Sequence, residues 1–105
     1  MSEGLPHEWR TSETGDLFEA ILSLRTLDEA ERFFRDLCTL AEIEALTHRW
    51  HAARLLDEAL PYHEVATRTG ASTTTVTRVA HWLKRGADGY RLVLDRRKQK
   101  VGRTA

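Results

Sequence analysis

The chain has 105 residues, of which 41% are hydrophobic and 30% charged, and it carries one cysteine and no net charge. This is the length of one globular domain, and the sequence has neither a low-complexity segment nor an apolar run of the roughly 18 residues needed to span a membrane. A single cysteine excludes an internal disulfide and favours a cytoplasmic protein. A monomer of this size would bury only about 60–65% of its unfolded surface, so we expect a homodimer.

The net charge of zero conceals a strong asymmetry along the chain. Residues 1–60 hold 6 Lys and Arg against 13 Asp and Glu, a balance of −7, whereas residues 61–105 hold 10 against 3, a balance of +7. A basic half of this kind is typical of a surface that meets a polyanion. The alternative is that the two halves complement each other electrostatically within the fold, because charge asymmetry alone is a weak signal.

The N-terminal segment, residues 1–15, is polar and is interrupted by Gly4, Pro6 and Gly15. Trp9 is its apolar anchor. The pattern predicts an arm that is either mobile or docked through Trp9 on a partner subunit.

Three helices are predicted between Asp16 and Pro61. The second and third begin with capping boxes at residues 26–29 and 39–42, and the third runs from about residue 40 to 59, where Pro61 ends it. Their apolar residues recur at helical steps. In chain order these are Leu17, Phe18, Ile21 and Leu22, then Leu27, Ala30, Phe34, Leu37 and Ala41, and finally Ile43, Leu46, Trp50, Ala53 and Leu56.

The run TTTVT at residues 73–77 is β-branched and would form a strand on propensity alone. Its context overrides that preference, because Gly70 and Ser72 precede it as a turn and an N-cap. Helically spaced residues follow, namely Val76, Val79, Ala80 and Leu83. The run therefore predicts the start of a helix.

The chain is predicted to close with a short helix after Gly86 and Gly89, followed by a frayed basic tail at residues 96–105. The short helix carries Tyr90, Val93 and Leu94. The sequence thus predicts an all-α fold of about six helices, with one domain over residues 16–95.

Residues 62–83 satisfy the spacing of a helix-turn-helix. Ala66 is the small residue at which the second helix crosses the first, and Gly70 permits the positive φ of the turn four positions later. Val76 and Val79 follow where the second helix must pack on the first. An ordinary helical hairpin with a glycine turn is the alternative. Thr69 stands where such motifs usually carry an apolar residue, so we expect looser packing there.

The face left over on the second helix consists of short hydroxyls and one cation. These residues are Ser72, Thr73, Thr74, Thr75, Thr77 and Arg78. Short hydroxyls allow a helix to lie deep in the major groove of DNA, where they reach phosphates, base edges or thymine methyl groups.

Residues 39–94 resemble the Trp repressor superfamily, in particular its YerC/YecD-like group. The resemblance is carried by TLAEIEALTHRWHAARLL, by the helix-turn-helix and by GADGYRLVL. It implies an all-α homodimer whose chains interlock through their N- and C-terminal helices and present two helix-turn-helix units to successive major grooves.

The resemblance also bears on the ligand of that family. Arg49 and Arg78 match two arginines that sandwich a bound indole, but Val79 replaces a glycine and Trp82 a serine of the repressor pocket. We therefore expect a filled pocket and no tryptophan binding. His63 replaces a base-contacting arginine, so the family's operator sequence is not expected to transfer.

Together these features predict a sequence-specific regulator of transcription that binds double-stranded DNA as a dimer. The residues expected to contact DNA are His63, Arg68, Ser72, Thr73, Thr74, Thr75, Thr77, Arg78 and Lys84. A protein–protein interaction module on the same scaffold is the alternative. A small enzyme or a ligand sensor is a further alternative. The sequence holds no catalytic motif and no ligand set at zinc spacing, so we expect no catalytic residue, cofactor or metal.

Overall fold

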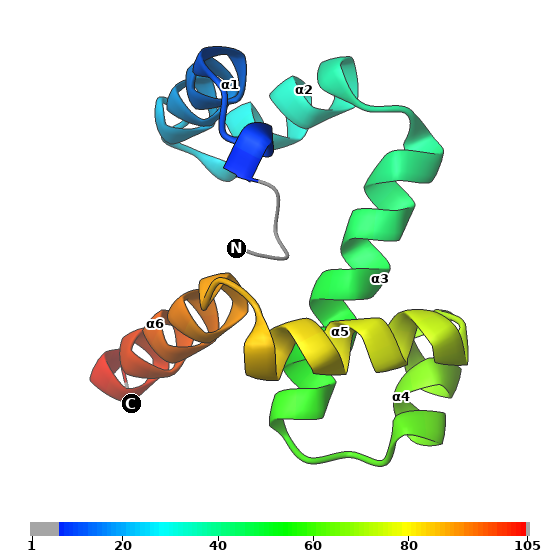
Figure 1. The fold of residues 1–105 in the computed structure, drawn as a ribbon. Helices are drawn as coiled ribbons and strands as arrows, with labels where there is room; N and C mark the ends of the chain where they lie inside the picture. Colours follow the sequence, from blue (N-terminus) through cyan, green and yellow to red (C-terminus); the bar gives the residue numbers. More distant parts are fainter. Residues whose placement is uncertain (1–6, 105) are drawn as a thin grey trace. The chain divides into compact units, whose positions relative to one another are not determined.

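The computed structural model describes residues 7–104, which form two compact units that divide after Leu40. Every regular element in this range is helical (Figure 1). The elements are a 3₁₀ turn at His7–Trp9, α1 (Ser12–Leu22), α2 (Leu27–Leu37), α3 (Leu40–Asp57), α4 (Tyr62–Thr69), α5 (Thr73–Arg85) and α6 (Gly89–Thr104). The predicted all-α class is confirmed. None of the helices described is long and apolar enough to cross a bilayer.

Helix α1 begins at Ser12, four residues before the apolar periodicity predicts. Thr11 and Thr14 cap its first turn reciprocally: the Thr14 N–H donates to Thr11 Oγ1 at 3.1 Å, and the Thr11 N–H donates to Thr14 Oγ1 at 2.8 Å. The helix therefore reaches into the predicted N-terminal arm, of which residues 1–6 lie outside the described part.

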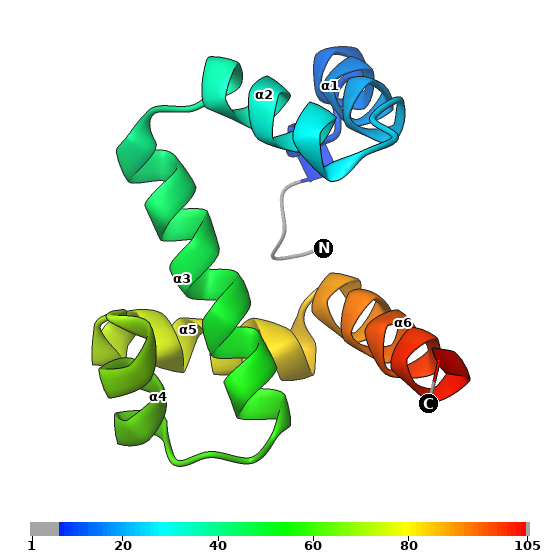
Figure 2. The ribbon, with the colours of Figure 1, turned by 180° about the vertical axis from the view of Figure 1, so that it is seen from behind.

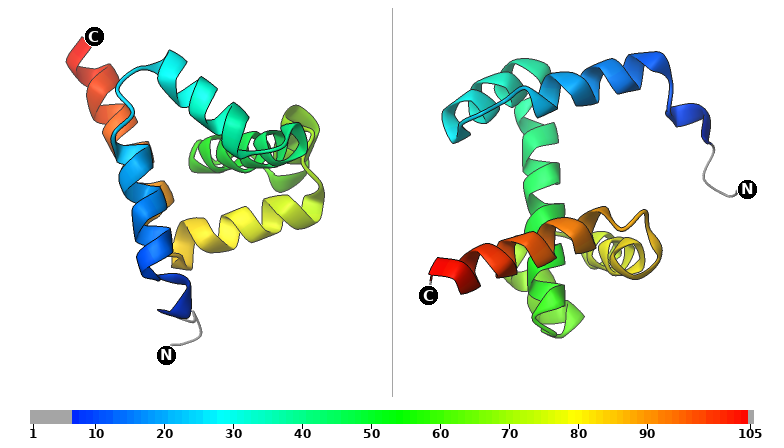
Figure 3. Two further views of the ribbon diagram at one scale, coloured as in Figure 1. Left: turned by 90° about the horizontal axis from the view of Figure 1, so that it is seen from above. Right: turned by 90° about the vertical axis from the view of Figure 1, so that its left-hand side faces the viewer.

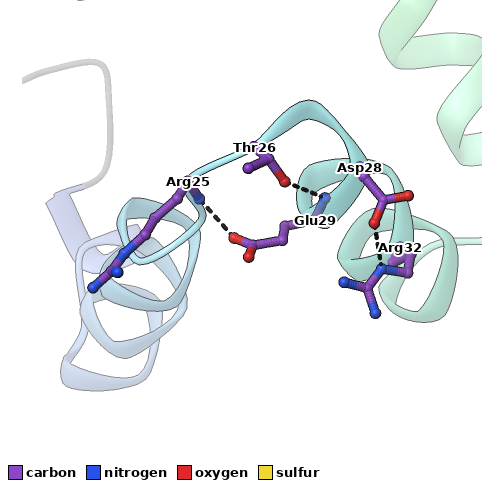
Figure 4. Close-up of polar contacts among 5 residues, drawn as sticks. All are labelled: Arg25, Thr26, Asp28, Glu29 and Arg32. Carbon is purple, nitrogen blue, oxygen red and sulfur yellow. Dashed lines mark hydrogen bonds and ion pairs between the residues drawn. The ribbon is translucent and has the colours of Figure 1, made fainter.

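The start of α2 contains the predicted cap, with one difference (Figure 4). Thr26 Oγ1 accepts from the Glu29 N–H at 3.1 Å, as a capping box requires. The Glu29 carboxylate, however, accepts from the N–H of Arg25 at 2.8 Å, one residue before the one expected. Both bonds satisfy backbone donors at the helix end, so the predicted start is correct although its reciprocal bond is shifted.

The first unit leaves its apolar side chains uncovered. Neither α1 nor α2 contains a buried residue. Leu22 is 82% exposed and Leu27 76% exposed, and Phe18 is half exposed although its ring meets that of Trp9 edge-on at 6.3 Å. Such a pair of helices lacks a core of its own within one chain.

The second unit has a core where α3, α4 and α5 meet (Figure 2). Its buried members are mostly small: Ala52, Ala53, Leu55, Val65, Ala71, Val76 and Val79. Small side chains let the helix backbones approach closely, and a close-packed core resists changes in the angles between the helices. Residues of α3 therefore pack beneath α4 and α5.

Helix α3 ends at Asp57, and the residue that terminates it is Ala59 and not Pro61. Ala59 adopts the left-handed conformation with φ of 66°. Its N–H donates to the Leu56 carbonyl at 2.9 Å and that of Leu60 donates to the Leu55 carbonyl at 3.3 Å. This is the bond pattern of a Schellman motif, in which glycine is the usual left-handed residue.

The last helix is longer than predicted. Helix α6 continues through the basic stretch as far as Thr104, instead of ending soon after Leu94. Leu94 is only 3% exposed, so it packs α6 against the rest of the second unit. The predicted short helix and frayed tail are corrected accordingly, since no Gly or Pro interrupts residues 90–101.

Candidate nucleic-acid interface

The turn between α4 and α5 is built as its sequence requires. Gly70 has φ of +80°, a conformation that L side chains rarely adopt, and its N–H donates to the Ala66 carbonyl at 3.0 Å. A Cβ placed there would lie 3.6 Å from the His48 ring, at ordinary contact distance. Glycine is thus needed for the backbone conformation and not for space, and the predicted helix-turn-helix geometry is present.

Thr69 packs tightly, contrary to the looser packing expected. It is 8% exposed, and its hydroxyl donates to the Val65 carbonyl at 2.8 Å while accepting from the Ala71 N–H at 3.1 Å. A buried hydroxyl with both bonds made carries little penalty. Thr69 therefore ties the last turn of α4 to the first residues of the connecting turn.

Ser72 caps α5, as the sequence predicts. Its Oγ accepts from the Thr75 N–H at 3.1 Å and lies 3.0 Å from Thr75 Oγ1. The cap explains how a β-branched run becomes helical, because it satisfies a free N–H in the first turn of that run. It also occupies the Thr75 hydroxyl, which is only partly exposed.

The remaining polar residues of α5 form one exposed face. Thr73, Thr74, Thr77 and Arg78 are exposed, opposite the buried Val76. The Thr77 hydroxyl donates to the Thr73 carbonyl at 3.0 Å, so it is left as an acceptor. Thr74 makes no such bond to the backbone among the contacts described and lies near the middle of this face at helical spacing.

Two further residues belong to the same face and were missed by the sequence reasoning. His81 and Arg85 are exposed and follow Thr74 and Arg78 at steps of seven along the helix. Their spacing from these residues was the available signal. The face, here called the α5 face, comprises Thr73, Thr74, Thr77, Arg78, His81, Lys84 and Arg85.

The charges near the α5 face are one-sided. Helix α5 contains Arg78, Lys84 and Arg85 and no acidic residue. On α4 the predicted contact Arg68 forms an ion pair with Glu64 at 2.6 Å, while His63 is exposed. The positive charge available to a polyanion therefore lies on α5, and Arg68 would have to exchange Glu64 for another anion.

A hollow of about 600 Å³ lies beside the α5 face and shares Arg78 with it. Its lining includes Arg49, Arg78, Val79, Trp82 and Tyr90. Val79 is buried, but Trp82 remains 48% exposed and packs edge-on against His81 at 4.8 Å. The expectation that these two side chains fill the space is wrong for the single chain: they line it.

Tyr90 and Arg49 form part of the wall of the hollow. Burial raises the pKa of Tyr90, and the positive charge of Arg49 partly opposes that shift. Arg49 is exposed and its Nε donates to the Ala45 carbonyl at 3.3 Å. The structure thus brings together Arg49 and Arg78, the two arginines matched to the ligand site, at one hollow.

Known proteins resemble the chain over most of its length. Residues 12–98 match the family described as Trp repressor protein. The protein YerC of Bacillus subtilis (strain 168) is 49% identical over 90 residues, which cover 86% of each chain.

Two solved structures share the fold. A TrpR-like protein from Eubacterium eligens superposes with a TM-score of 0.83 at 45% identity, over 87% of this chain and 94% of that one. A candidate Trp repressor from Staphylococcus aureus reaches 0.86 at 35% identity, over 91% and 96%. With its helix-turn-helix and this agreement in sequence and fold, the chain belongs to the Trp repressor family.

Proposed function

We propose that the protein is a regulator of transcription that binds specific sequences of double-stranded DNA as a homodimer, through the α5 face. The observation that carries the proposal is a capped, exposed helix with three cations, short hydroxyls and no acid. A helix of this kind fits the major groove, where cations reach phosphates and short side chains reach base edges.

The residues of the α5 face divide into two roles. Thr73, Thr74 and Thr77 are proposed to meet base edges, with Thr74 the most central of them. Arg78, Lys84 and Arg85 are proposed to hold phosphates, whose contacts supply most of the affinity. Ser72 and Thr75 act as the cap of the helix, because their hydroxyls lie 3.0 Å apart and engage each other.

His63 and Arg68 on α4 are proposed to lie at the edge of the groove. His63 is exposed, and Arg68 is already paired with Glu64. A contact from Arg68 to a phosphate would cost that pair, so we expect its contribution to be smaller than that of Arg78.

A second copy of the chain is the proposed partner of the first unit. Supporting this, α1 and α2 bury no residue of their own, and Leu22, Leu27 and Leu40 are each more than half exposed. Contiguous apolar surface on a small protein marks an interface. In the dimer the two α5 helices should lie about 34 Å apart, which is one turn of DNA.

Salt dependence of duplex binding tests the proposal against the alternative of a protein-interaction module. Three cations on each α5 neutralise about six phosphates per dimer, which predicts a log–log slope of about −5 for the association constant against salt. A matched control duplex bearing neutral methylphosphonate linkages should bind weakly at every salt concentration. A slope near zero, or no binding at about 50 mM salt, would contradict the proposal.

A further inference from the structure

Asp57 links the end of α3 to α6 through two cations. Its side chain is only 11% exposed. Arg91 Nη2 donates to Asp57 Oδ1 at 2.9 Å, and Lys98 Nζ donates to Asp57 Oδ2 at 2.8 Å. Both carboxylate oxygens are therefore engaged by residues two turns apart on α6. The cations, Lys98 above all, hold the pKa of Asp57 below its ordinary value.

Trp50 provides a second attachment between the same two helices. Its ring stacks with that of Tyr90 at 6.5 Å and 18°, and the guanidinium of Arg97 lies 5.7 Å from its centre. Helix α6 thus crosses α3 with aromatic contacts and ion pairs at both ends of residues 90–98 (Figure 3, right). Three of its basic residues, Arg91, Arg97 and Lys98, serve these contacts.

Helix α6 in turn constrains the end of α5. Only residues 86–88 connect them. A Cβ at Gly86 would lie 2.5 Å from the Trp82 carbonyl oxygen, and Asp88 adopts φ of 67°, so this link has little freedom. Tyr90 also lines the hollow together with Arg78 and Trp82 of α5. A displacement of α6 would therefore move the C-terminal half of α5.

We propose that Asp57 is a positioning residue for DNA recognition: by holding α6 on α3 through Arg91 and Lys98, it fixes the angle at which α5 presents Arg78 and Lys84. The inference rests on the proposed function of the α5 face. Asp57 itself touches no DNA, and its effect passes through α6 and the short link to α5.

Charge alone predicts the opposite effect of removing this carboxylate. Asp57→Asn makes the protein more positive by one unit and should strengthen binding to a polyanion. Asp95→Asn makes the same change in charge, but Asp95 pairs with Arg91 within α6 at 3.0 Å and joins no second helix. The two variants therefore separate positioning from electrostatics.

The test compares the full-length variants on a selected duplex and on a random duplex, by fluorescence anisotropy. We expect the ratio of specific to random affinity to fall about three- to tenfold in Asp57→Asn and to stay within about twofold in Asp95→Asn. Asp57→Glu, which keeps the charge, should restore part of the ratio. Loss of folded protein would lower both affinities together and leave the ratio unchanged. Equal ratios in Asp57→Asn and Asp95→Asn, with the affinity for the random duplex retained in both, would overturn the proposal.

A second pair of variants covers the case in which Asp57→Asn does not fold. Lys98→Gln removes the ion pair of Lys98 with Asp57, which is one of the two pairs that hold α6. Arg96→Gln removes the same charge from the neighbouring exposed surface. The ratio should fall only in Lys98→Gln. If both lower it equally, the proposal is wrong.

Amide hydrogen exchange without DNA keeps the result independent of the proposed function. Residues 82–94 should exchange faster in Asp57→Asn than in Asp95→Asn, because releasing α6 loosens the end of α5. Unchanged exchange would refute the positioning role even if DNA binds. If residues 82–94 exchange faster in Asp57→Asn but the parent protein binds no duplex, the function proposed for the α5 face is refuted and the attachment of α6 to α3 stands.

Discussion

Two left-handed residues, Ala59 and Gly70, allow the backbone geometry of this fold to be tested by reciprocal substitutions. Ala59 ends α3 with φ of 66°, and Gly70 ends α4 with φ of +80°. The left-handed conformation costs a residue with a Cβ roughly 1–2 kcal/mol. Glycine, on the other hand, raises the entropy of the unfolded chain by the equivalent of about 0.4–1 kcal/mol.

The cost of the left-handed conformation exceeds the entropic effect of glycine, so the sign of each change in stability is determined. Ala59→Gly should stabilise the protein by about 0.5–1 kcal/mol, and Gly70→Ala should destabilise it by a similar amount. No steric cost adds to the second value, because the new Cβ at Gly70 would lie 3.6 Å from the His48 ring.

Urea unfolding followed by circular dichroism measures both changes. The protein concentration must be identical in all samples, because the stability of a dimer depends on it. Gly15→Ala, in the exposed interior of α1 where a Cβ meets nothing within 4 Å, controls for glycine replacement without left-handed strain and should stabilise. A destabilised Ala59→Gly, or a neutral Gly70→Ala, would refute the conformational argument.

Three further predictions concern binding and pH. Arg78→Ala should weaken binding to all duplexes and make the salt slope shallower by about one per subunit. Thr74→Ala should instead change the sequence preference and leave the salt slope unchanged. If the two variants behave alike in anisotropy titrations, the division of roles is contradicted. Because the folded-state pKa of Asp57 is lowered, its contribution to stability should be complete above the unfolded value of about 3.9 and be lost as pH falls below it. Asp57→Asn should therefore show a flatter loss of unfolding free energy below about pH 4, and an unchanged profile would speak against the ion pairs. Although Val79 and Trp82 leave the hollow open, Trp82 places an indole ring of the chain itself in the same lining as Arg78, so calorimetry with free tryptophan should give no saturable heat. A Kd below about 1 mM would contradict this prediction.

Local signals account for what the sequence predicts correctly. Gly70, Ser72 and the spacing of Val76 and Val79 fix the turn and the start of α5, since each acts through neighbours within a few residues. The looser packing predicted at Thr69 is wrong, because its hydroxyl bonds to two backbone groups and so allows a polar residue to be buried there.

Contacts between distant residues were beyond the sequence reasoning. The pairing of Asp57 with Arg91 and Lys98 joins segments whose proximity depends on the packing of α6. The hollow likewise depends on where Trp82 rests, and no local pattern reports that position. The sequence does not predict the early start of α1, because its cap is made by two threonines and not by the threonine and glutamate of the usual capping box.

Selection of bound duplexes from a random library tests the central claim most directly, because it reports binding, sequence preference and spacing in one measurement. A dimer that presents two α5 helices to successive major grooves predicts enriched sites with two related half-sites, about 10–10.5 base pairs apart from centre to centre. Recovery of duplexes with no enriched sequence, or with a single half-site, would contradict the account.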